Sequence, residues 1–238
     1  MIINFNTLSR ADEKVGEESS VSYGTVRKVE TLLKFSNEDQ LVKLGAGKVS
    51  ISHVFTNYKR SRYHEETPKL PKGEFDVILC DPHPRYEMNL RDWAEQHYQT
   101  MDYKEIEEMK IPSADNCVLF LWTTQSLIKE SLFIMENWDF KYKSGAVWVK
   151  DKIGTGYYFM FRHELLLIGV KGTMPIPEER NRGDSVIEAP RRKHSEKPYK
   201  VYEMIETMYP NRKYLELFAR SKYNEKWSVW GLEAPLIK

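Results

Sequence analysis

From Gly73 onward the sequence alternates short apolar runs with segments of helical periodicity, and this alternation limits the possible folds more than any other feature. The runs are rich in Val, Ile, Leu, Phe and Trp, as strands are when both faces of their sheet are covered. They are FDVILC (75–80), CVLFLW (117–122), AVWVK (146–150), HELLLIGV (163–170), SVIEA (185–189), YLELFA (214–219) and WSVW (227–230). The alternation predicts an α/β fold with a wound, mainly parallel sheet covered by helices.

Two segments between these runs carry the clearest helical pattern, SLIKESLFIMENW (126–138) and PYKVYEMIETMY (198–209). In the second, Val201, Ile205 and Met208 recur at helical spacing, and Pro198 suits a first turn. Folds of this type bind ligands outside the carboxyl ends of their strands. Residues that directly follow the apolar runs are therefore the first candidates for a functional site.

The overall composition sets limits on the kind of protein. A length of 238 residues suffices for one sizeable α/β domain and a small appendage. No stretch approaches the roughly 20 apolar residues that span a bilayer, and the first residues lack the pattern of a signal peptide, so we expect a cytoplasmic protein without membrane contact. Cys80 and Cys117 each lie in an apolar run, which predicts buried thiols, and we assign no metal.

Charge gives little help in naming a partner. The chain has 36 Lys and Arg against 35 Asp and Glu, a net charge of +1. The whole molecule therefore has no large field to attract a polyanion, and any contact with nucleic acid depends on local basic patches.

Residues 8–35 have the pattern of two helices separated by a tight turn. The apolar positions expected to face inward are Val15, Val21, Val26, Val29 and Leu33. Ser22 can cap a helix that begins at the next residue, because its hydroxyl can accept a hydrogen bond from a first-turn N–H group. This helix would expose small polar and basic groups, as a recognition helix does. They are Tyr23, Thr25, Arg27 and Lys28.

This N-terminal segment resembles the helix-turn-helix of ParB-like partition proteins, in which a VS-x-x-TVRK run opens the recognition helix. The resemblance continues through LVKLGAGKVSISHVFTNYKR (41–60). A helix pair that only covers the larger domain is an equally good interpretation. Residues 63–73 have the Pro and charge content of a linker. We expect a small helical, helix-turn-helix-like domain over 1–62, a linker over 63–73 and a second domain over 74–238.

Directly after the first apolar run stands Asp81-Pro82-His83-Pro84-Arg85-Tyr86-Glu87. An acid at the carboxyl end of a strand, followed by prolines that restrict the backbone, predicts a rigid loop rich in hydrogen-bond acceptors. The loop resembles the Asp-Pro-Pro-Trp or Asp-Pro-Pro-Tyr motif of the amino-methyltransferases. Its trailing Arg-Tyr-Glu is similar to bacterial and phage members of the mRNA-adenosine-methyltransferase family.

The resemblance covers residues 73–234 and keeps the family's order of motifs. They are CVLFLWTT (117–124), GYYFMFRHELLLIGVKG (156–172), HSEKP (194–198), YLELFAR (214–220) and WSVWG (227–231). It implies a Rossmann-like methyltransferase fold and transfer of a methyl group from S-adenosyl-L-methionine to the N6 amine of adenine. We favour DNA over RNA as substrate, because of the possible helix-turn-helix and the bacterial and phage relatives. A homodimer, or a heterodimer with a paralogous methyltransferase subunit, is the expected assembly.

The resemblance also implies roles for single residues. The Asp81 carboxylate and the Pro82 carbonyl would accept hydrogen bonds from the adenine amine, a poor nucleophile whose lone pair is delocalised into the ring. His83 and Pro84 complete this catalytic loop. The implied cofactor-binding residues are Asp81, Ser195, Glu196, Lys197, Glu216, Phe218, Arg220 and Glu233. Among them Lys197, or the N–H groups at the start of the helix that follows it, would face the methionine carboxylate, and Glu233 could face the ribose hydroxyls.

Basic residues beside these motifs are candidates for phosphate contacts. They are Arg85, Arg191, Arg192 and Lys193. A solvated surface is the alternative for so short a cluster. Neutralising the cluster at 191–193 should reduce the salt dependence of binding if it contacts phosphates.

The catalytic loop departs from the family pattern. His83 and Pro84 stand where the family has Pro and the aromatic that stacks on the extruded base, and Leu232 stands where relatives commonly have Asn. Base stacking contributes about 1–3 kcal/mol, so its loss would weaken binding or turnover roughly 5- to 150-fold. His163 and Glu164 match a family pair to which we assign no chemical role; a structural histidine is one interpretation. An inactive methyltransferase-like nucleic-acid-binding or partner subunit stays open, as does a regulator that acts through its helix-turn-helix.

Overall fold

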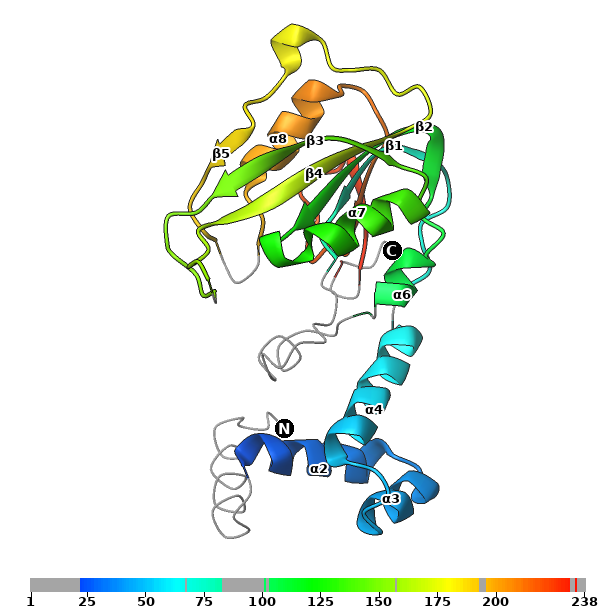
Figure 1. The fold of residues 1–238 in the computed structure, drawn as a ribbon. Coiled ribbons are helices and arrows are strands. Elements are labelled where there is room, and N and C mark those ends of the chain that lie inside the picture. Colours follow the sequence, from blue (N-terminus) through cyan, green and yellow to red (C-terminus); the bar gives the residue numbers. More distant parts are fainter. Residues whose placement is uncertain are drawn as a thin grey trace, which may run out of the picture. The chain divides into compact units, whose positions relative to one another are not determined.

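A computed structural model describes residues 22–66, 68–82, 101, 103–156, 158–192, 196–231 and 234. The chain divides into two compact units, Met1–Glu66 and Thr67–Lys238. Figure 1 labels their helices and strands. Among the described residues, no helix is long and apolar enough to cross a membrane.

The first unit contains the helices α2 (Tyr23–Phe35), α3 (Glu38–Gly45) and α4 (Ile51–Glu66). The N-cap predicted for α2 is confirmed, since the Ser22 Oγ accepts a hydrogen bond from the Thr25 N–H at 3.3 Å. Asn37 caps α3 in the same way, accepting from the Gln40 N–H at 2.9 Å. Both helices thus begin where a side chain satisfies a first-turn donor.

The inner face of α2 agrees with the prediction at Val26 but not at Leu33, and Val15 and Val21 lie outside the described residues. Val26 and Leu32 are buried with Val54 of α4, whereas Leu33, predicted to face inward, is 64% exposed. Successive helix positions are about 100° apart, so the side of α2 that buries Leu32 turns Leu33 outward. α4 continues to Glu66, so the first four residues of the segment expected to be a linker, 63–73, are helical, and the first helix-breaking residue after them is Pro68.

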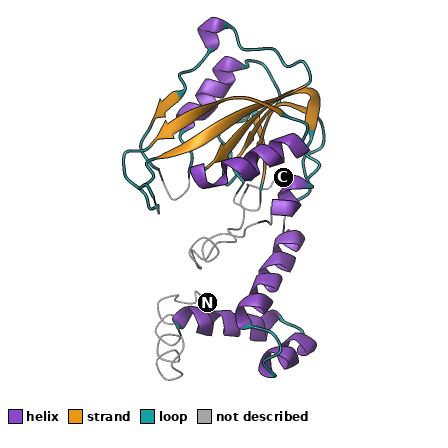
Figure 2. Ribbon diagram, in the orientation of Figure 1, coloured by secondary structure: helices purple, strands orange, loops and turns teal. Residues whose placement is uncertain are grey.

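The second unit is built on a seven-stranded sheet of order β5-β3-β4-β2-β1-β6-β7 (Figure 2). The strands are β1 (Phe75–Cys80), β2 (Ser113–Thr123), β3 (Lys141–Val149), β4 (His163–Lys171), β5 (Val186–Glu188), β6 (Tyr214–Leu217) and β7 (Trp227–Trp230). β4 is antiparallel to β2 and β3, and the other pairs are parallel. The predicted α/β fold with a mainly parallel sheet is confirmed.

Helices cover both faces of this sheet (Figure 2). They are α6 (Tyr103–Glu107), α7 (Ile128–Asn137) and α8 (Tyr199–Met208), with short 3₁₀ turns η1 (Gln125–Leu127) and η2 (Glu179–Asn181). Val201 and Ile205 of α8 pack into one core with Val77 and Leu79 of β1. On α7, Ser131 donates a hydrogen bond to Thr123 of β2 at 2.7 Å. Successive side chains of a strand point to opposite faces of the sheet, so each strand contributes side chains to the packing against the helices on both faces.

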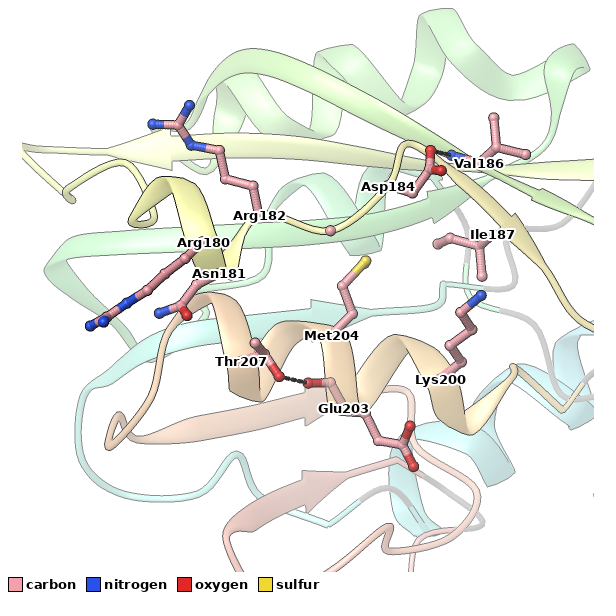
Figure 3. Close-up of a pocket in the computed structure, with 11 residues that line it drawn as sticks. Arg180, Asn181, Arg182, Asp184, Val186, Ile187, Lys200, Glu203, Met204 and Thr207 are labelled. Carbon is pink, nitrogen blue, oxygen red and sulfur yellow. Dashed lines mark hydrogen bonds between the residues drawn. The ribbon is translucent and has the colours of Figure 1, made fainter.

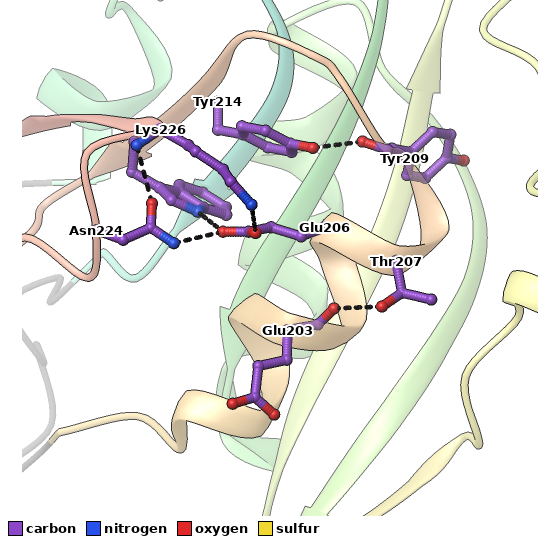
Figure 4. A network of polar contacts seen from close by, with 8 residues as sticks. Glu203, Glu206, Thr207, Tyr209, Tyr214, Asn224 and Lys226 are labelled. Atoms are coloured by element: carbon purple, nitrogen blue, oxygen red, sulfur yellow. Dashed lines mark hydrogen bonds and ion pairs between the residues drawn. The ribbon is translucent and has the colours of Figure 1, made fainter.

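α8 is tied to the sheet by polar contacts as well as by apolar packing (Figure 4). Glu206 accepts hydrogen bonds from Asn224 at 2.7 Å and from the Trp227 indole at 3.0 Å, and it pairs with Lys226 at 2.5 Å. These contacts fix the helix against β7 and the turn before it. The residues at the start of α8 are thereby held in place over the sheet.

All strands except β4 run in one direction, so their carboxyl ends meet at one edge of the sheet together with the amino end of β4. Both cysteines are buried and free, as predicted, Cys80 at the end of β1 and Cys117 in β2. Burial raises the pKa of both thiols, to about 12 for Cys117. The carboxyl edge is where the fold class places ligands.

Candidate active site

Asp81 and Pro82 directly follow β1 at the carboxyl edge. The Asp81 N–H donates a hydrogen bond to the Leu217 carbonyl of β6 at 3.3 Å, which extends the strand pairing by one residue. The first residue of the predicted catalytic loop is therefore held by the sheet itself. The buried apolar run before it positions Asp81 because every strand residue from Val77 to Cys80 is packed in the core.

Lys197 joins two acids that come from different strands. Its Nζ lies 2.9 Å from the Asp81 Oδ2 and 3.1 Å from the Glu164 Oε2, and its side chain is only 8% exposed. Burial alone would lower the pKa of this ammonium, but the charges of Asp81 and Glu164 outweigh burial and raise the pKa above its ordinary value. Lys197 is thus a permanent cation beside Asp81.

Glu164, on β4, extends this contact into a row of alternating charges. Lys150, the residue after β3, forms a short hydrogen-bonded ion pair with the Glu164 Oε1. Burial alone would raise the pKa of Glu164, yet the neighbouring Lys197 and Lys150 lower it to about 2. We call Asp81, Lys197, Glu164 and Lys150 the ion-pair row. Its two acids and two bases balance, which is the condition for burying charge without a large penalty.

Two indole rings lie beneath the lysines of the ion-pair row. The Lys197 Nζ is 5.4 Å from the ring centroid of Trp122, and the Lys150 Nζ is 4.9 Å from that of Trp148. The two rings meet edge to face at 6.0 Å. Ring faces attract cations, so the aromatic pair helps to hold both ammonium groups at the sheet edge.

Glu216, on β6 beside β1, is a third acid near this edge, and it is buried. The Tyr202 hydroxyl donates a hydrogen bond to its Oε1 at 2.8 Å. Burial, reinforced by the charge of Asp81, raises the pKa of Glu216 to about 7, although Tyr202 and Lys197 act in the opposite direction. Its Oε2 and the Trp122 Nε1 have no hydrogen-bond partner among the described residues. Such buried groups are costly unless a ligand satisfies them.

Beyond β6 the backbone turns sharply. Phe218 has a φ of 62°, and its ring packs edge to face on Trp230 at 5.3 Å. The Ala219 N–H donates to the Trp230 carbonyl at 2.9 Å. A Cβ at Gly231 would lie 2.4 Å from the Ala219 carbonyl oxygen, so only glycine fits this close approach. The ends of β6 and β7 are thus held closely together next to Glu216.

Residues 75–233 match the model of the MT-A70 family. The chain belongs to the MT-A70 family. It is 33% identical to the Type II methyltransferase M.MunI of Mycoplasma sp over 201 residues, which cover 75% of this chain and 86% of that protein. The family assignment made from the motifs is confirmed, together with the enzyme class and the cofactor that it implies: MT-A70 proteins are adenine-N6 methyltransferases that use S-adenosyl-L-methionine.

Eukaryotic MT-A70 relatives are matched over a smaller share of their length. The N(6)-adenosine-methyltransferase catalytic subunit METTL3 of Homo sapiens is 31% identical over 159 residues, which are 62% of this chain and 26% of that protein. An MT-A70-like N(6)-adenosine-methyltransferase of Arabidopsis thaliana is 32% identical over 157 residues, 62% of this chain and 22% of that protein. The chain therefore spans about a quarter of the length of these relatives. The ParB-like resemblance of residues 8–60 stays a prediction.

The MT-A70 cofactor is a zwitterion with a cationic sulfonium, ribose hydroxyls and a purine ring, and the described residues offer complementary groups. Lys197 presents a buried positive charge for a carboxylate. Glu216 Oε2 and Trp122 Nε1 provide an acceptor and a donor without protein partners among the described residues. The Phe218 turn adds an aromatic surface. The residues present thus fit S-adenosyl-L-methionine.

The structure brings together some predicted site residues but not all. Asp81, Pro82, Lys197, Glu216 and Phe218 lie at the carboxyl edge or in the elements that border it. Several predicted positions lie outside the described residues: His83, Pro84, Arg85, Lys193, Ser195, Leu232 and Glu233, and the side chain of Tyr23. The remaining positions of α2, Thr25, Arg27 and Lys28, belong to the first unit.

The segment before α8 uses its charges internally. Arg192 pairs with Glu196 at 3.1 Å, and its guanidinium lies 3.7 Å from the ring centroid of Tyr199. The Arg191 N–H donates to the Asp151 Oδ1 at 2.8 Å, a bond that is the main cause of the lowered pKa of Asp151. Glu196 and Arg192 therefore position the chain that leads to Lys197. Arg220, also predicted, is half-buried in the turn after β6.

Sequence reasoning missed the roles of Glu164 and Lys150. The available signal was a charged residue at the start of an otherwise apolar run, HELLLIGV. His163, the neighbour of Glu164, has Gln125 as a partner at 3.1 Å, consistent with a structural histidine.

A pocket of about 270 Å³ lies elsewhere, between α8 and the segment from η2 to β5 (Figure 3). Met204 of α8 lies across it, and Arg180, Arg182 and Lys200 are among its lining residues. No member of the ion-pair row lines it. It is therefore separate from the candidate active site.

Proposed function

We propose that this chain transfers the methyl group of S-adenosyl-L-methionine to the N6 amine of adenine in DNA. The observation that carries the proposal is the placement of Asp81 and Pro82 at the carboxyl end of β1, with the buried cation Lys197 at 2.9 Å from the Asp81 carboxylate. Hydrogen-bond acceptors at this turn can stabilise the positive charge that develops on an adenine amine as it is methylated, and Lys197 holds the acceptor Asp81 in place.

In this proposal the chain's own groups orient the amine. The Asp81 carboxylate and the Pro82 carbonyl accept hydrogen bonds from the two N–H groups, which directs the nitrogen lone pair away from the ring as the nitrogen becomes tetrahedral. Lys197 holds the carboxylate in position through their ion pair. The cofactor, when bound, supplies an electrophilic methyl group on its sulfonium.

The same proposal gives the remaining residues their roles. Lys197 faces the methionine carboxylate of the cofactor, and the Glu216 Oε2 accepts a hydrogen bond from a donor group of the cofactor. The tight turn at Phe218 borders the cofactor. Ser195, Glu196, Arg220 and Glu233 complete the proposed cofactor set.

Two observations support DNA as the substrate. The relative that matches over most of both chains is a Type II methyltransferase, whereas the N(6)-adenosine-methyltransferases are matched over about a quarter of their length. The first unit also presents a capped helix, α2, with an exposed Arg27 at its polar side. A target adenine must be single-stranded or extruded from a duplex to reach Asp81.

A methyl-transfer assay on one sequence, presented as duplex DNA, single-stranded DNA and RNA, tests the proposal. We expect DNA to be methylated and Asp81→Ala to abolish the transfer. Asp115→Ala, which removes an exposed acid from the distant half of β2, is the matched control and should leave the rate unchanged.

Three outcomes would each correct a different part of the proposal. Undiminished activity of Asp81→Ala would show that the catalytic assignment is wrong. A preference for RNA would overturn the choice of DNA. A third outcome is that no substrate is methylated while the cofactor still binds, as shown by a rise of the melting temperature in its presence. This outcome would favour an inactive partner subunit, the alternative that the departures at His83 and Pro84 left open.

A further inference from the structure

The β3–β4 loop, residues 150–162, starts and ends at the carboxyl edge of the sheet. It connects Val149 at the end of β3 with His163 at the start of β4, and these two residues are paired. Lys150, its first residue, belongs to the ion-pair row that leads through Glu164 and Lys197 to Asp81. In Figure 1 the loop projects past the ends of the strands. A ligand that reaches Asp81 from solvent therefore approaches beside this loop.

Large apolar side chains of this loop face solvent. Tyr158 is 97% exposed and Phe159 is 77% exposed, and Ile153 and Met160 are also exposed. Single exposed apolar residues are ordinary on a protein surface, but several in one loop mark an interaction site.

The backbone that carries these exposed side chains is held by hydrogen bonds within the loop. The Lys150 N–H donates to the Arg162 carbonyl at 2.8 Å, and the Gly154 N–H donates to the Phe161 carbonyl at 2.7 Å. The Arg162 side chain donates back to the Lys150 carbonyl at 2.9 Å. A Cβ at Gly156 would lie 1.9 Å from the Phe159 carbonyl oxygen, so glycine permits a tight turn there. The loop backbone thus holds the rings away from the core.

The loop that carries the exposed rings also carries two exposed bases, Lys152 and Arg162. Its third base, Lys150, is paired with Glu164, and the single acid within 150–162 is Asp151. The Asp151 carboxylate accepts the Arg191 N–H at 2.8 Å, which places the basic segment 191–192 beside the loop. Exposed aromatic rings among cations are the features with which proteins bind single-stranded nucleic acid, because rings stack on bases and cations attract phosphates. A second copy of this chain fits less well, since a symmetric contact would oppose like charges.

We propose that Tyr158 and Phe159 stack on bases of the substrate strand next to the adenine that is methylated. This inference rests on the proposed function, since it takes a nucleic acid as the substrate. The sequence has Pro84 where the family motif carries its stacking aromatic, and this loop offers two aromatic rings at the same edge of the sheet. The loop therefore contributes affinity for the strand and fixes the target base over Asp81.

The test uses the full chain and a single-stranded oligonucleotide with one target adenine and 2-aminopurine at either neighbouring position. Stacking on an aromatic ring changes the fluorescence of 2-aminopurine. We expect Tyr158→Ser and Phe159→Ser each to weaken binding roughly 5- to 150-fold and to abolish the fluorescence change at one flanking position. Tyr158→Trp and Phe159→Trp should retain both. Phe133→Ser and Tyr142→Ser, which remove exposed aromatics from α7 and from the distant end of β3, are matched controls that should change neither.

The outcomes separate this inference from the proposed function. If the wild type methylates the oligonucleotide but both serine variants bind and respond as the wild type does, the stacking role is wrong and the function stands. If the wild type neither binds nor methylates any nucleic acid, the function fails and the inference with it. If the serine variants instead sediment with a lower molecular mass than the wild type, the loop is a contact between copies of the chain, and the proposal is overturned. Unchanged cofactor affinity in the variants, measured by calorimetry, would support an effect on the nucleic acid alone.

Discussion

Lys197 is the residue whose contacts most affect both stability and chemistry at the site. The buried Lys197 ammonium neutralises two half-buried acids, Asp81 and Glu164, at 2.9 and 3.1 Å. Lys197→Met would leave both acids without this partner, and breaking a buried ion pair costs about 3–5 kcal/mol. We expect the free energy of unfolding to fall by about that amount in urea denaturation. Lys200→Met, at an exposed position of α8, is the control; equal stability of the two variants would contradict the buried pairing.

Glu216 makes stability depend on pH near neutrality. Its pKa is raised by burial from 4.5 to about 7, so the native state holds a proton that the unfolded chain has lost between these two pH values. Stability therefore falls as the pH rises through this window and levels off above it. Glu216→Gln should remove this loss and raise the free energy of unfolding on the order of 3 kcal/mol at pH 8, with little difference near pH 4.5.

Urea denaturation of the wild type and of Glu216→Gln at pH 5, 6, 7 and 8 measures this effect. Glu203→Gln, at an exposed position of the same helix as Tyr202, is the control. If the free energy of unfolding varies with pH in the same way for the wild type and for Glu216→Gln, Glu216 is ionised over this whole pH range. Its pKa would then not be raised by burial.

Site residues that belong to a local motif could be predicted from the sequence, whereas residues whose role depends on contacts between distant segments could not. Asp81 and Pro82 were identified because they directly follow a strongly apolar run. Glu164 and Lys150 were not, because their role depends on the order of strands, in which β4 lies next to β2 and β2 next to β1. No spacing along the chain reveals that Glu164 and Lys197 meet.

At the scale of elements, the close approach between the ends of β6 and β7 depends on Gly231. In Gly231→Ala the new Cβ would lie 2.4 Å from the Ala219 carbonyl oxygen and 2.8 Å from its nitrogen. The strands must move apart, so we expect a loss of about 1–3 kcal/mol or more in the free energy of unfolding. Cofactor affinity should fall as well, because Phe218 shifts with this turn.

Thermal denaturation and calorimetric cofactor titration check the Gly231→Ala prediction. Ser221→Ala, at an exposed position of the same turn, is the control. A Gly231→Ala protein that binds the cofactor as the wild type does would show that the turn after β6 takes no part in binding.

Apolar patterning predicted the centres of the strands better than their ends. β2 begins at Ser113 and β3 at Lys141, before the apolar runs predicted at 117 and 146. These first residues are polar, so the apolar pattern omits them, yet Ser113 pairs with Phe75 and Lys141 with Val170. The antiparallel direction of β4 was also beyond the pattern, since hydropathy does not encode strand direction. For α2 the helix was predicted, but its inner face shifted from Leu33 to Leu32 through packing on α4.

At the scale of the whole molecule, a net charge of +1 means that binding to a polyanion depends on a few local cations. The exposed candidates are divided between the two units, with Arg27 on α2 in the first and Arg191 beside the β3–β4 loop in the second. Each phosphate contact adds about 0.9 to the slope of log affinity against log salt on duplex DNA and about 0.7 on a single strand. Salt titrations can therefore assign contacts to units.

We expect Arg191→Ala to lower the salt slope by the amount of about one phosphate contact on both duplex and single-stranded DNA. The reason is that Arg191 lies beside the β3–β4 loop, where we propose that the substrate strand binds. Arg27→Ala with Lys28→Ala should lower the slope by about two contacts on duplex DNA only, because a recognition helix requires a major groove. Arg180→Ala, which removes an exposed cation paired with Glu178, is the control. An unchanged duplex slope in the α2 variant would show that this helix pair does not contact DNA, and would favour its interpretation as a cover for the larger domain.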